Sequence, residues 1–166
     1  RYSQETASGL RWRMPSMLAV LAMFGWAAGI VPAIIDGTIR VNRVMHNTLW
    51  VPGHFHFYLL LGVLPMLLAF MYHLIGGRVD RPDRGGDRLA LMVYLLGGLT
   101  FVSMFLAGGH ASEPRRYAVH FVQWRPYDRV ASIGAVLVIS AMLLFAARLC
   151  YGLLKAPARP GVALNG

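Results

Sequence analysis

Long apolar runs separated by short polar segments make up most of this chain. Four runs of about 20 residues or more cover residues 14–35, 49–75, 89–109 and 130–154. A run of this length can cross the hydrocarbon core of a bilayer as an α-helix. The pattern therefore predicts an all-α fold, a polytopic membrane helical bundle with four transmembrane helices, as a single membrane domain piece over residues 1–166.

Proline, glycine and charged residues divide these runs. Pro32 and Asp36 mark the end of the first run, and Asp36 is expected at a solvated helix end. Segment 37–48 is expected to be a loop, and the Gly-, Asp- and Arg-rich segment 76–88 a solvated connector. Pro65 falls in the middle of the second run, where it is expected to kink the helix, which neighbouring helices of a bundle can absorb.

Composition and charge agree with a membrane protein. The chain is 57% hydrophobic and 14% charged, with a net charge of +9. Its basic residues lie between the apolar runs, so topology and anionic headgroups explain them better than nucleic acid does. Ten Lys and Arg on the side of the termini against six on the other predict both termini in the cytoplasm. The single Cys150 excludes a disulfide framework, and a start at Arg1 suggests a piece of something larger.

Two histidines, His54 and His56, lie near the start of the second run. An ionisable side chain within a span is costly without a partner, which makes it a functional candidate. A helix turns about 100° per residue, so the two imidazoles should point about 200° apart. Two separate metal centres fit that spacing better than one. Neutral imidazole is a good axial ligand for haem iron, so two haems flanking one helix is the hypothesis. The alternative is two imidazoles with structural hydrogen bonds.

Two polar groups are expected at the same end of the bundle. Arg115 and Arg116 follow Pro114 in the loop between the third and fourth runs. Guanidinium groups pair well with carboxylates such as haem propionates. The motif alone slightly favours two exposed loop arginines, but its placement relative to the histidines favours the propionate interpretation. His46 and Asn47 precede the histidine pair and could form a polar cluster above the haems, or could be ordinary surface residues.

The segment from His46 to His56, His-Asn-Thr-Leu-Trp-Val-Pro-Gly-His-Phe-His, resembles subunit I of the haem-copper oxygen reductases around transmembrane helix ten. It looks closer to the B-type (ba3-like) branch than to the mitochondrial-type branch, which usually has Asp at the position of Asn47 and Val-Ala at Pro52-Gly53. The resemblance implies that the chain is the C-terminal portion, the last four helices, of a subunit with twelve or more.

The resemblance also implies roles for single residues. His54 would be the axial ligand of the high-spin haem and His56 an axial ligand of the low-spin haem. Arg115 and Arg116 would hold haem propionates. His46 would belong to the propionate-side polar cluster that is linked to proton release.

Two further positions depart from relatives of this kind. Asn47 in place of Asp argues against the magnesium ion of the mitochondrial-type branch. Asn42 stands where B-type members can carry an acid, which leaves a proton-loading role there open.

The complete enzyme implied is a cytochrome c oxidase of the inner (plasma) membrane that reduces oxygen to water and translocates protons in a respiratory chain. Its partners would be the remaining helices of subunit I, a copper-containing subunit II, cytochrome c as electron donor and membrane lipid. Its copper would not be ligated by this chain. The alternatives are a nitric oxide reductase large-subunit fragment and a small non-enzymatic haem-binding or structural membrane protein. Gly97-Gly98 and similar small residues look suited to close helix contacts, which argues against the last alternative.

Overall fold

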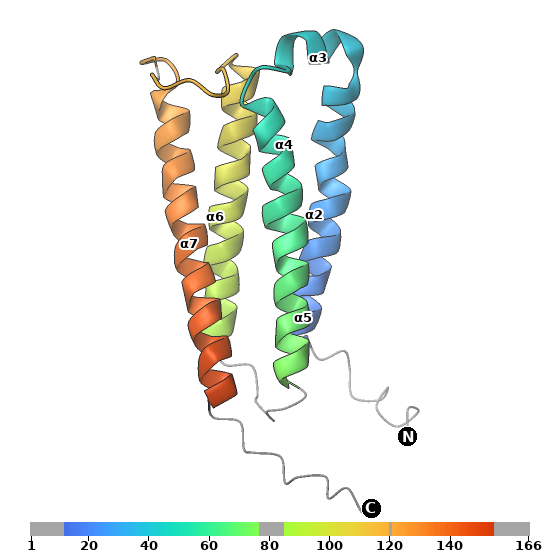
Figure 1. Ribbon diagram of the computed structural model, residues 1–166, viewed down its shortest axis with the longest axis vertical. Helices are drawn as coiled ribbons and strands as arrows, with labels where there is room; N and C mark the ends of the chain where they lie inside the picture. Colours follow the sequence, from blue (N-terminus) through green and yellow to red (C-terminus); the bar gives the residue numbers. More distant parts are fainter. Residues whose placement is uncertain (1–11, 77–84, 120, 155–166) are drawn as a thin grey trace, which may run out of the picture.

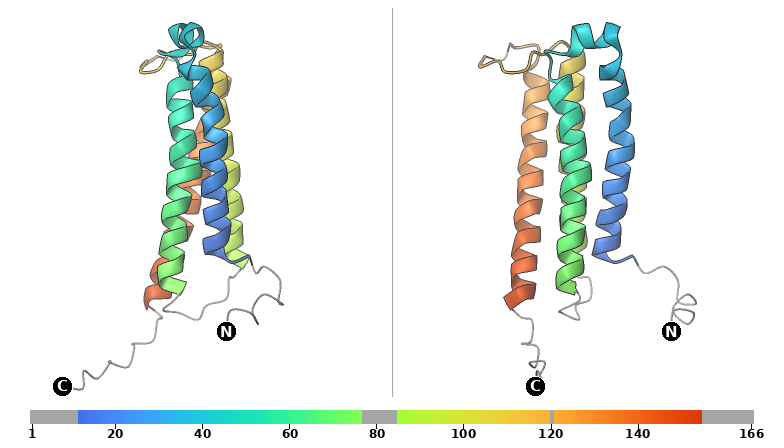
Figure 2. Two further views of the ribbon diagram at one scale, coloured as in Figure 1. Left: turned by 90° about the vertical axis from the view of Figure 1, so that its right-hand side faces the viewer. Right: turned by 45° about the vertical axis from the view of Figure 1, so that its right-hand side comes forward.

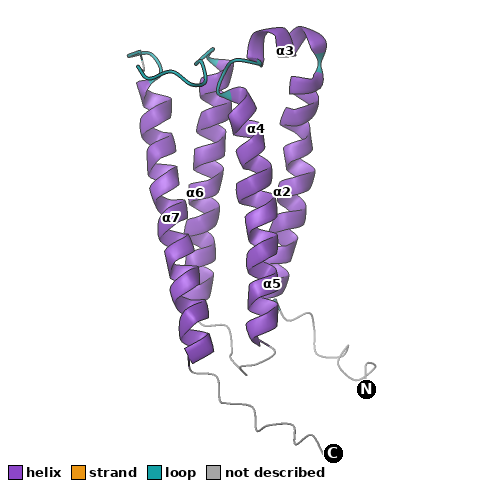
Figure 3. Cartoon of the chain, viewed as in Figure 1, coloured by secondary structure: helices purple, strands orange, loops and turns teal. Residues whose placement is uncertain are grey.

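The structure is a computed structural model that describes residues 12–76, 85–119 and 121–154. Within these residues the regular structure is helical (Figure 3). Four long helical stretches lie side by side and nearly parallel or antiparallel to one another (Figures 1 and 2). All four are long and apolar enough to cross a membrane: Met14–Gly37, Trp50–Ile75, Gly85–His110 and Arg125–Leu154. The predicted all-α fold with four membrane-spanning helices is confirmed.

Helix α2 (Met14–Gly37) begins where the sequence allows it and continues further than expected. Pro15 lies in its first turn, where a missing N–H has no helical partner to lose. Pro32 lies inside the helix instead of ending it, and Asp36 belongs to the last turn. The side chain of Asp36 is only 15% exposed. The expectation of a solvated helix end at Asp36 is therefore wrong.

A short helix, α3 (Ile39–Met45), crosses one end of the bundle and joins α2 to the second span (Figure 1). The sequence predicted a loop here because Arg and Asn interrupt the apolar pattern. Thr38 has an extended backbone with φ −77° and ψ 118°, which breaks α2 from α3 and lets the chain turn. Helix α3 contains no buried residue, so it caps the end of the bundle instead of packing inside it.

The second span consists of α4 (Trp50–Tyr58), the π-helical segment η2 (Leu59–Val63) and α5 (Leu64–Gly76). Pro65 explains the wider turn, since it has no N–H to donate to the carbonyl of Leu61. The amide of Leu64 instead reaches back five residues to the carbonyl of Leu59. The hydroxyl of Tyr94 donates to the carbonyl of Leu60 at 2.5 Å, which ties this segment to the third span. Pro65 therefore changes the course of the second span through the π-helical turn that precedes it.

Helices α6 (Gly85–His110) and α7 (Arg125–Leu154) pack closely along their length. A Cβ added at Gly97 would lie 2.7 Å from the Cβ of Leu137 and 2.8 Å from the carbonyl oxygen of Gly134. No larger side chain fits at that distance without moving the helices apart. Gly97 therefore serves close contact with α7, and a Cβ at Gly98 would lie 3.1 Å from Cδ2 of Leu61 in the second span. Both glycines serve close helix contact, as the sequence predicted.

A buried carboxylate holds three helices together at the end of the bundle far from α3. Asp87 is 4% exposed and forms a two-pronged ion pair with Arg148 of α7, in which Arg148 Nη2 lies 3.1 Å from Asp87 Oδ2. The hydroxyl of Tyr72 in α5 donates to Asp87 Oδ1 at 3.1 Å. The sequence placed Asp87 in a solvated connector, and this was wrong because α6 begins at Gly85. Residues 77–84 of that connector lie outside the described residues.

Candidate functional site

The segment before α4 and the loop after α6 are paired through their backbones. Thr48 and Pro114 form an isolated antiparallel bridge. On either side of it, the amide of Leu49 donates to the carbonyl of Glu113, and the amide of Arg115 donates to the carbonyl of Asn47, both at 2.8 Å. The loop after α6 is therefore fixed beside the start of the histidine-bearing helix.

Close approach of helix backbones supports this pairing. A Cβ at Gly109, in the last turn of α6, would overlap the backbone of Trp50 at the start of α4. The hydroxyl of Thr48 accepts from the amide of Trp50 at 3.2 Å and donates to the carbonyl of Met45 at 2.8 Å. The carboxylate of Glu113 is almost fully buried beneath the same loop.

The four polar candidates lie at this end of the bundle. Arg115 is half-buried, whereas Arg116 is exposed and has a left-handed backbone with φ 66°. Both His46 and Asn47 are exposed. The structure therefore brings Asn47 and Arg115 directly together and leaves His46 and Arg116 facing outward. It shows no contact that assigns the arginines a ligand, so their role stays a prediction.

His56 faces the third span. Its imidazole lies edge-on to the rings of Phe101 and Phe105 of α6, with centroids 5.3 and 5.6 Å away. Its Nδ1 lies 2.6 Å from the carbonyl oxygen of Pro52, one turn earlier in α4. A carbonyl can only accept, so Nδ1 carries the proton and donates it. This leaves the lone pair on Nε2 free to bind a metal.

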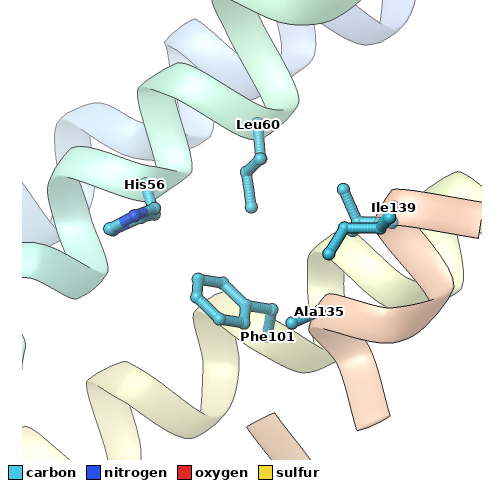
Figure 4. Close-up of a pocket in the computed structure, with 6 residues that line it drawn as sticks. His56, Leu60, Phe101, Ala135 and Ile139 are labelled. Atoms are coloured by element: carbon cyan, nitrogen blue, oxygen red, sulfur yellow. The ribbon is translucent and has the colours of Figure 1, made fainter. Parts of the chain in front are cut away.

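An apolar pocket of about 130 Å³ opens beside His56. Leu60, Phe101, Ala135 and Ile139 surround it, so it lies between the second, third and fourth spans (Figure 4). Pockets that enclose a whole small ligand measure roughly 300–1,000 Å³. The pocket formed by the described residues is therefore apolar and too small by itself to enclose such a ligand.

His54 faces the first span instead. Its imidazole is edge-on to the ring of Tyr58, with centroids 6.2 Å apart, and its side chain is 23% exposed. Its Nδ1 lies 3.8 Å from Oδ2 of Asp36 in α2. Two histidines two residues apart therefore contact different neighbouring helices, in agreement with the 200° separation expected from the helix period.

Sequence reasoning missed three residues of this site. Asp36 was assigned to solvent because nothing in the sequence shows that the turn at Thr38 brings it back over α4. Phe101 and Phe105 were read only as part of an apolar run. Their spacing of four residues puts both rings on one face of a helix, and this was the available signal.

The residues present fit a haem better than a metal ion held by protein alone. Among the described residues, no three His, Cys, Asp or Glu side chains gather as a metal-binding group. Haem needs only one or two protein ligands, because its own ring supplies four nitrogens. An imidazole with Nδ1 bonded to a carbonyl, beside an apolar pocket and two aromatic rings, has the chemistry of such a ligand.

Four membrane-spanning helices with two opposed imidazoles on one of them define a polytopic membrane protein with a candidate cofactor-binding helix. The family described as Cytochrome C and Quinol oxidase polypeptide I matches residues 5–137. The chain belongs to this family.

The chain is also similar to named relatives. It is 28% identical over 145 residues to Cytochrome c oxidase subunit 1 of Cereibacter sphaeroides, a match that covers 86% of this chain and 25% of that protein. It is 29% identical over 164 residues to Cytochrome c oxidase subunit 1 of Thermus thermophilus, covering 93% and 29%. It is 30% identical over 152 residues to Heme-copper oxidase subunit I+III of Aeropyrum pernix, covering 88% and 18%. The chain thus spans less than a third of each of these relatives.

A solved structure of a heme-copper terminal oxidase dimer shares the fold. It superposes with a TM-score of 0.78 at 23% sequence identity, over 91% of this chain and 29% of that one. The helix arrangement of the four spans is therefore one already seen within a much longer subunit.

Proposed function

We propose that this chain is the haem-holding, C-terminal portion of the catalytic subunit of a B-type terminal oxidase. The complete complex would reduce oxygen to water with electrons from cytochrome c and translocate protons. It would lie in the plasma membrane with both ends of this portion in the cytoplasm. Family membership and the coverage of relatives support this proposal. The observation that carries it is that the two imidazoles of one span lie against different neighbouring helices, His54 beside Asp36 of α2 and His56 beside Phe101 of α6.

His56 is proposed as an axial ligand of the low-spin haem. Its Nδ1 proton is held by the carbonyl of Pro52, so Nε2 is presented in a fixed tautomer and orientation. Phe101 and the apolar wall of Leu60 and Ile139 would pack against the porphyrin and exclude water. When bound, this haem would supply one-electron transfer.

His54 is proposed as the single protein ligand of the high-spin haem, whose iron would face a copper ion and supply the oxygen-binding centre. The copper ligands would come from helices outside this chain, as would the second ligand of the low-spin haem. Subunit II, with its own copper, and the donor cytochrome c would complete the path of electrons.

Arg115, Arg116, His46 and Asn47 are proposed to form the propionate side of both haems. The backbone pairing of Asn47 with Arg115 supports this assignment, because it fixes the arginine loop beside the start of α4. Guanidinium groups at that end would neutralise propionates, and the exposed His46 and Asn47 would hold water and protons above them.

The test compares three histidine variants of the complex purified from its native membrane. We expect His56→Leu to lose the low-spin haem and His54→Leu to lose the carbon-monoxide-reactive haem, each reducing haem content from two per complex to one. His73→Leu is the matched control, since His73 is an exposed histidine of the same span. Pyridine haemochrome assay, optical spectra and metal analysis provide the readouts.

Each other outcome is informative. Two haems with unchanged spectra in both His54 and His56 variants would refute the ligand assignment. Non-haem iron in place of copper in the intact complex would identify a nitric oxide reductase instead. Absence of haem from the intact native complex would leave a structural membrane protein.

A further inference from the structure

Two polar side chains with buried, unsatisfied atoms lie close together between the first and second spans. Oδ1 of Asp36 and Nδ1 of His54 are both buried and have no hydrogen-bond partner among the described residues. The other carboxylate oxygen, Oδ2 of Asp36, lies 3.8 Å from Nδ1 of His54. Each unsatisfied buried group costs roughly 1–3 kcal/mol, so such a pair calls for an explanation.

The separation favours direct contact over a bridging water. It is longer than the 2.7–3.2 Å of an N–H···O hydrogen bond. However, two hydrogen bonds of about 2.8 Å meeting at a tetrahedral water would hold their outer atoms about 4.6 Å apart. The gap of 3.8 Å between Asp36 and His54 is too short for that water. A side-chain movement of less than about 1 Å would bring Nδ1 of His54 and Oδ2 of Asp36 within hydrogen-bond distance.

The neighbouring contacts hold the two helices where this pair can form. The indole of Trp50 donates from Nε1 to the carbonyl of Pro32 at 3.3 Å. Trp50 and His54 are four residues apart and share a face of α4, and Pro32 and Asp36 share a face of α2 in the same way. The carboxylate of Asp36 therefore lies on the same face of α2 as Pro32, whose carbonyl accepts the hydrogen bond from Trp50 of α4.

We propose that Asp36 is the positioning residue of His54, and that it accepts the Nδ1 proton so that Nε2 faces the high-spin haem. This inference rests on the proposed function of His54. A carboxylate partner fixes the tautomer and gives the imidazole more anionic character than a neutral carbonyl does. The anionic imidazole stabilises ferric over ferrous iron. His56, bonded to the carbonyl of Pro52, lacks that charge.

The experiment removes the charge and keeps the shape. In the assembled complex, we expect Asp36→Asn to lower the iron–histidine stretching frequency of the ferrous, five-coordinate haem in resonance Raman spectra. Loss of this partner should raise the ratio of reduced to oxidised high-spin haem about tenfold at a fixed potential, which is about 59 mV for one electron. The low-spin haem should keep its potential.

Two further variants separate charge from packing. Asp36→Ser carries a smaller neutral side chain and should shift the stretching band in the same direction, which keeps the test available if the amide variant does not assemble. Trp50→Phe is the matched control, because it removes the bond to Pro32 and leaves the charge in place. It should shift the band less than Asp36→Asn does, because the carboxylate beside His54 stays in place.

The outcomes distinguish this inference from the proposed function. A band and potential in the haem-loaded Asp36→Asn complex that match the unchanged protein would overturn the role of Asp36 while leaving His54 as ligand. A stretching band that survives in His54→Leu would instead refute the ligand assignment itself. A shift in Trp50→Phe equal to that in Asp36→Asn would reduce Asp36 to a packing residue.

Discussion

The two histidines of α4 have different surroundings although only one residue separates them. His56 contacts helices of this same chain, with aromatic rings, an apolar pocket and a neutral carbonyl as its hydrogen-bond partner. His54 has a carboxylate and a tyrosine ring beside it and a partly exposed side chain. One side of the helix is therefore apolar, and the other side carries a carboxylate.

This difference shows how one helix can give two identical imidazoles different chemical surroundings. Helical geometry alone directs the two imidazoles to different neighbouring helices, and those helices then set the polarity around each imidazole. In the proposed assignment, the neutral and apolar surrounding of His56 goes with the haem that would only pass electrons. The carboxylate beside His54 goes with the haem that would react with a small molecule.

The largest expected effect comes from filling the apolar pocket beside His56. Ala135 lines the pocket beside His56, and Ala135→Phe would place a ring in a space of about 130 Å³. Overpacking costs roughly 1–3 kcal/mol, which need not prevent folding. We expect haem content to fall from two per complex to one, with loss of the low-spin optical band and retention of carbon monoxide binding.

The matched control for this variant lies on the same helix. Ile133 is 60% exposed, and Ile133→Phe should keep both haems. Equal haem content in the Ala135 and Ile133 variants would show that the pocket is not the low-spin site. Loss of the carbon-monoxide-reactive haem instead would reverse the assignment of the two sides.

The second prediction concerns α6 and α7, the two helices that line the pocket beside His56 together with the second span. Asp87→Asn removes the buried charge that joins α6 to Arg148 of α7. Leaving one partner of a buried ion pair alone typically costs about 3–5 kcal/mol. We expect a lower midpoint temperature of the complex and earlier heat release of the low-spin haem than of the high-spin haem. Arg88→Gln, next in the same helix and exposed, serves as the control.

The sequence predicted the helices well and their long-range contacts poorly. Four apolar runs suffice to predict four spans, and the helix period suffices to separate His54 from His56. Asp36 and Asp87 were both assigned to solvent, since a charge beside a glycine looks like a helix end. Their partners lie 18 and 61 residues away along the chain, and no local pattern reports such a contact.

The polar end of the bundle was predicted in part. The alternation of spans places His46, Asn47 and the arginine loop at one end, which the structure shows. Nothing in the sequence indicates that the backbone of Asn47 bonds to that of Arg115, because two loops carry no register signal. The roles of the arginines, of His46 and of the histidine ligands remain predictions.

The third prediction separates the two arginines. Arg115 is half-buried and fixed through its backbone to Asn47, whereas Arg116 is exposed. A hydrogen bond to a charged group contributes about 1.5–3 kcal/mol, so Arg115→Gln should speed release of one haem to a scavenger protein about tenfold or more. Arg116→Gln should have a smaller effect.

Which haem leaves faster assigns the arginine to one side of α4. Release of both haems at the same increased rate would mean that Arg115 serves the two sides alike. Unchanged rates in both variants would remove the arginines from the propionate site. Arg125→Gln, at the exposed start of α7, is the control for a loss of positive charge at this end.

The smallest expected effect is that of Tyr72→Phe. Tyr72 lies in α5, on the same span as both histidines, and its hydroxyl donates to Asp87 Oδ1 at 3.1 Å. Phenylalanine keeps the edge-on contact with Phe145, whose ring centroid is 6.1 Å away, and removes only the hydrogen bond. Because Arg148 still pairs with Asp87, the loss should be about 1 kcal/mol, or roughly a fivefold change in the unfolding equilibrium.

This variant sharpens the comparison when it is combined with Asp87→Asn. If Tyr72 acts through the carboxylate, the double variant should be little less stable than Asp87→Asn alone, because the hydroxyl has already lost its charged acceptor. Thermal unfolding of the four complexes, with Tyr117→Phe as the exposed control, measures this coupling. Full additivity would mean that Tyr72 stabilises the histidine span independently of α6 and α7. The pocket beside His56 would then not depend on the hydrogen bond between Tyr72 and Asp87.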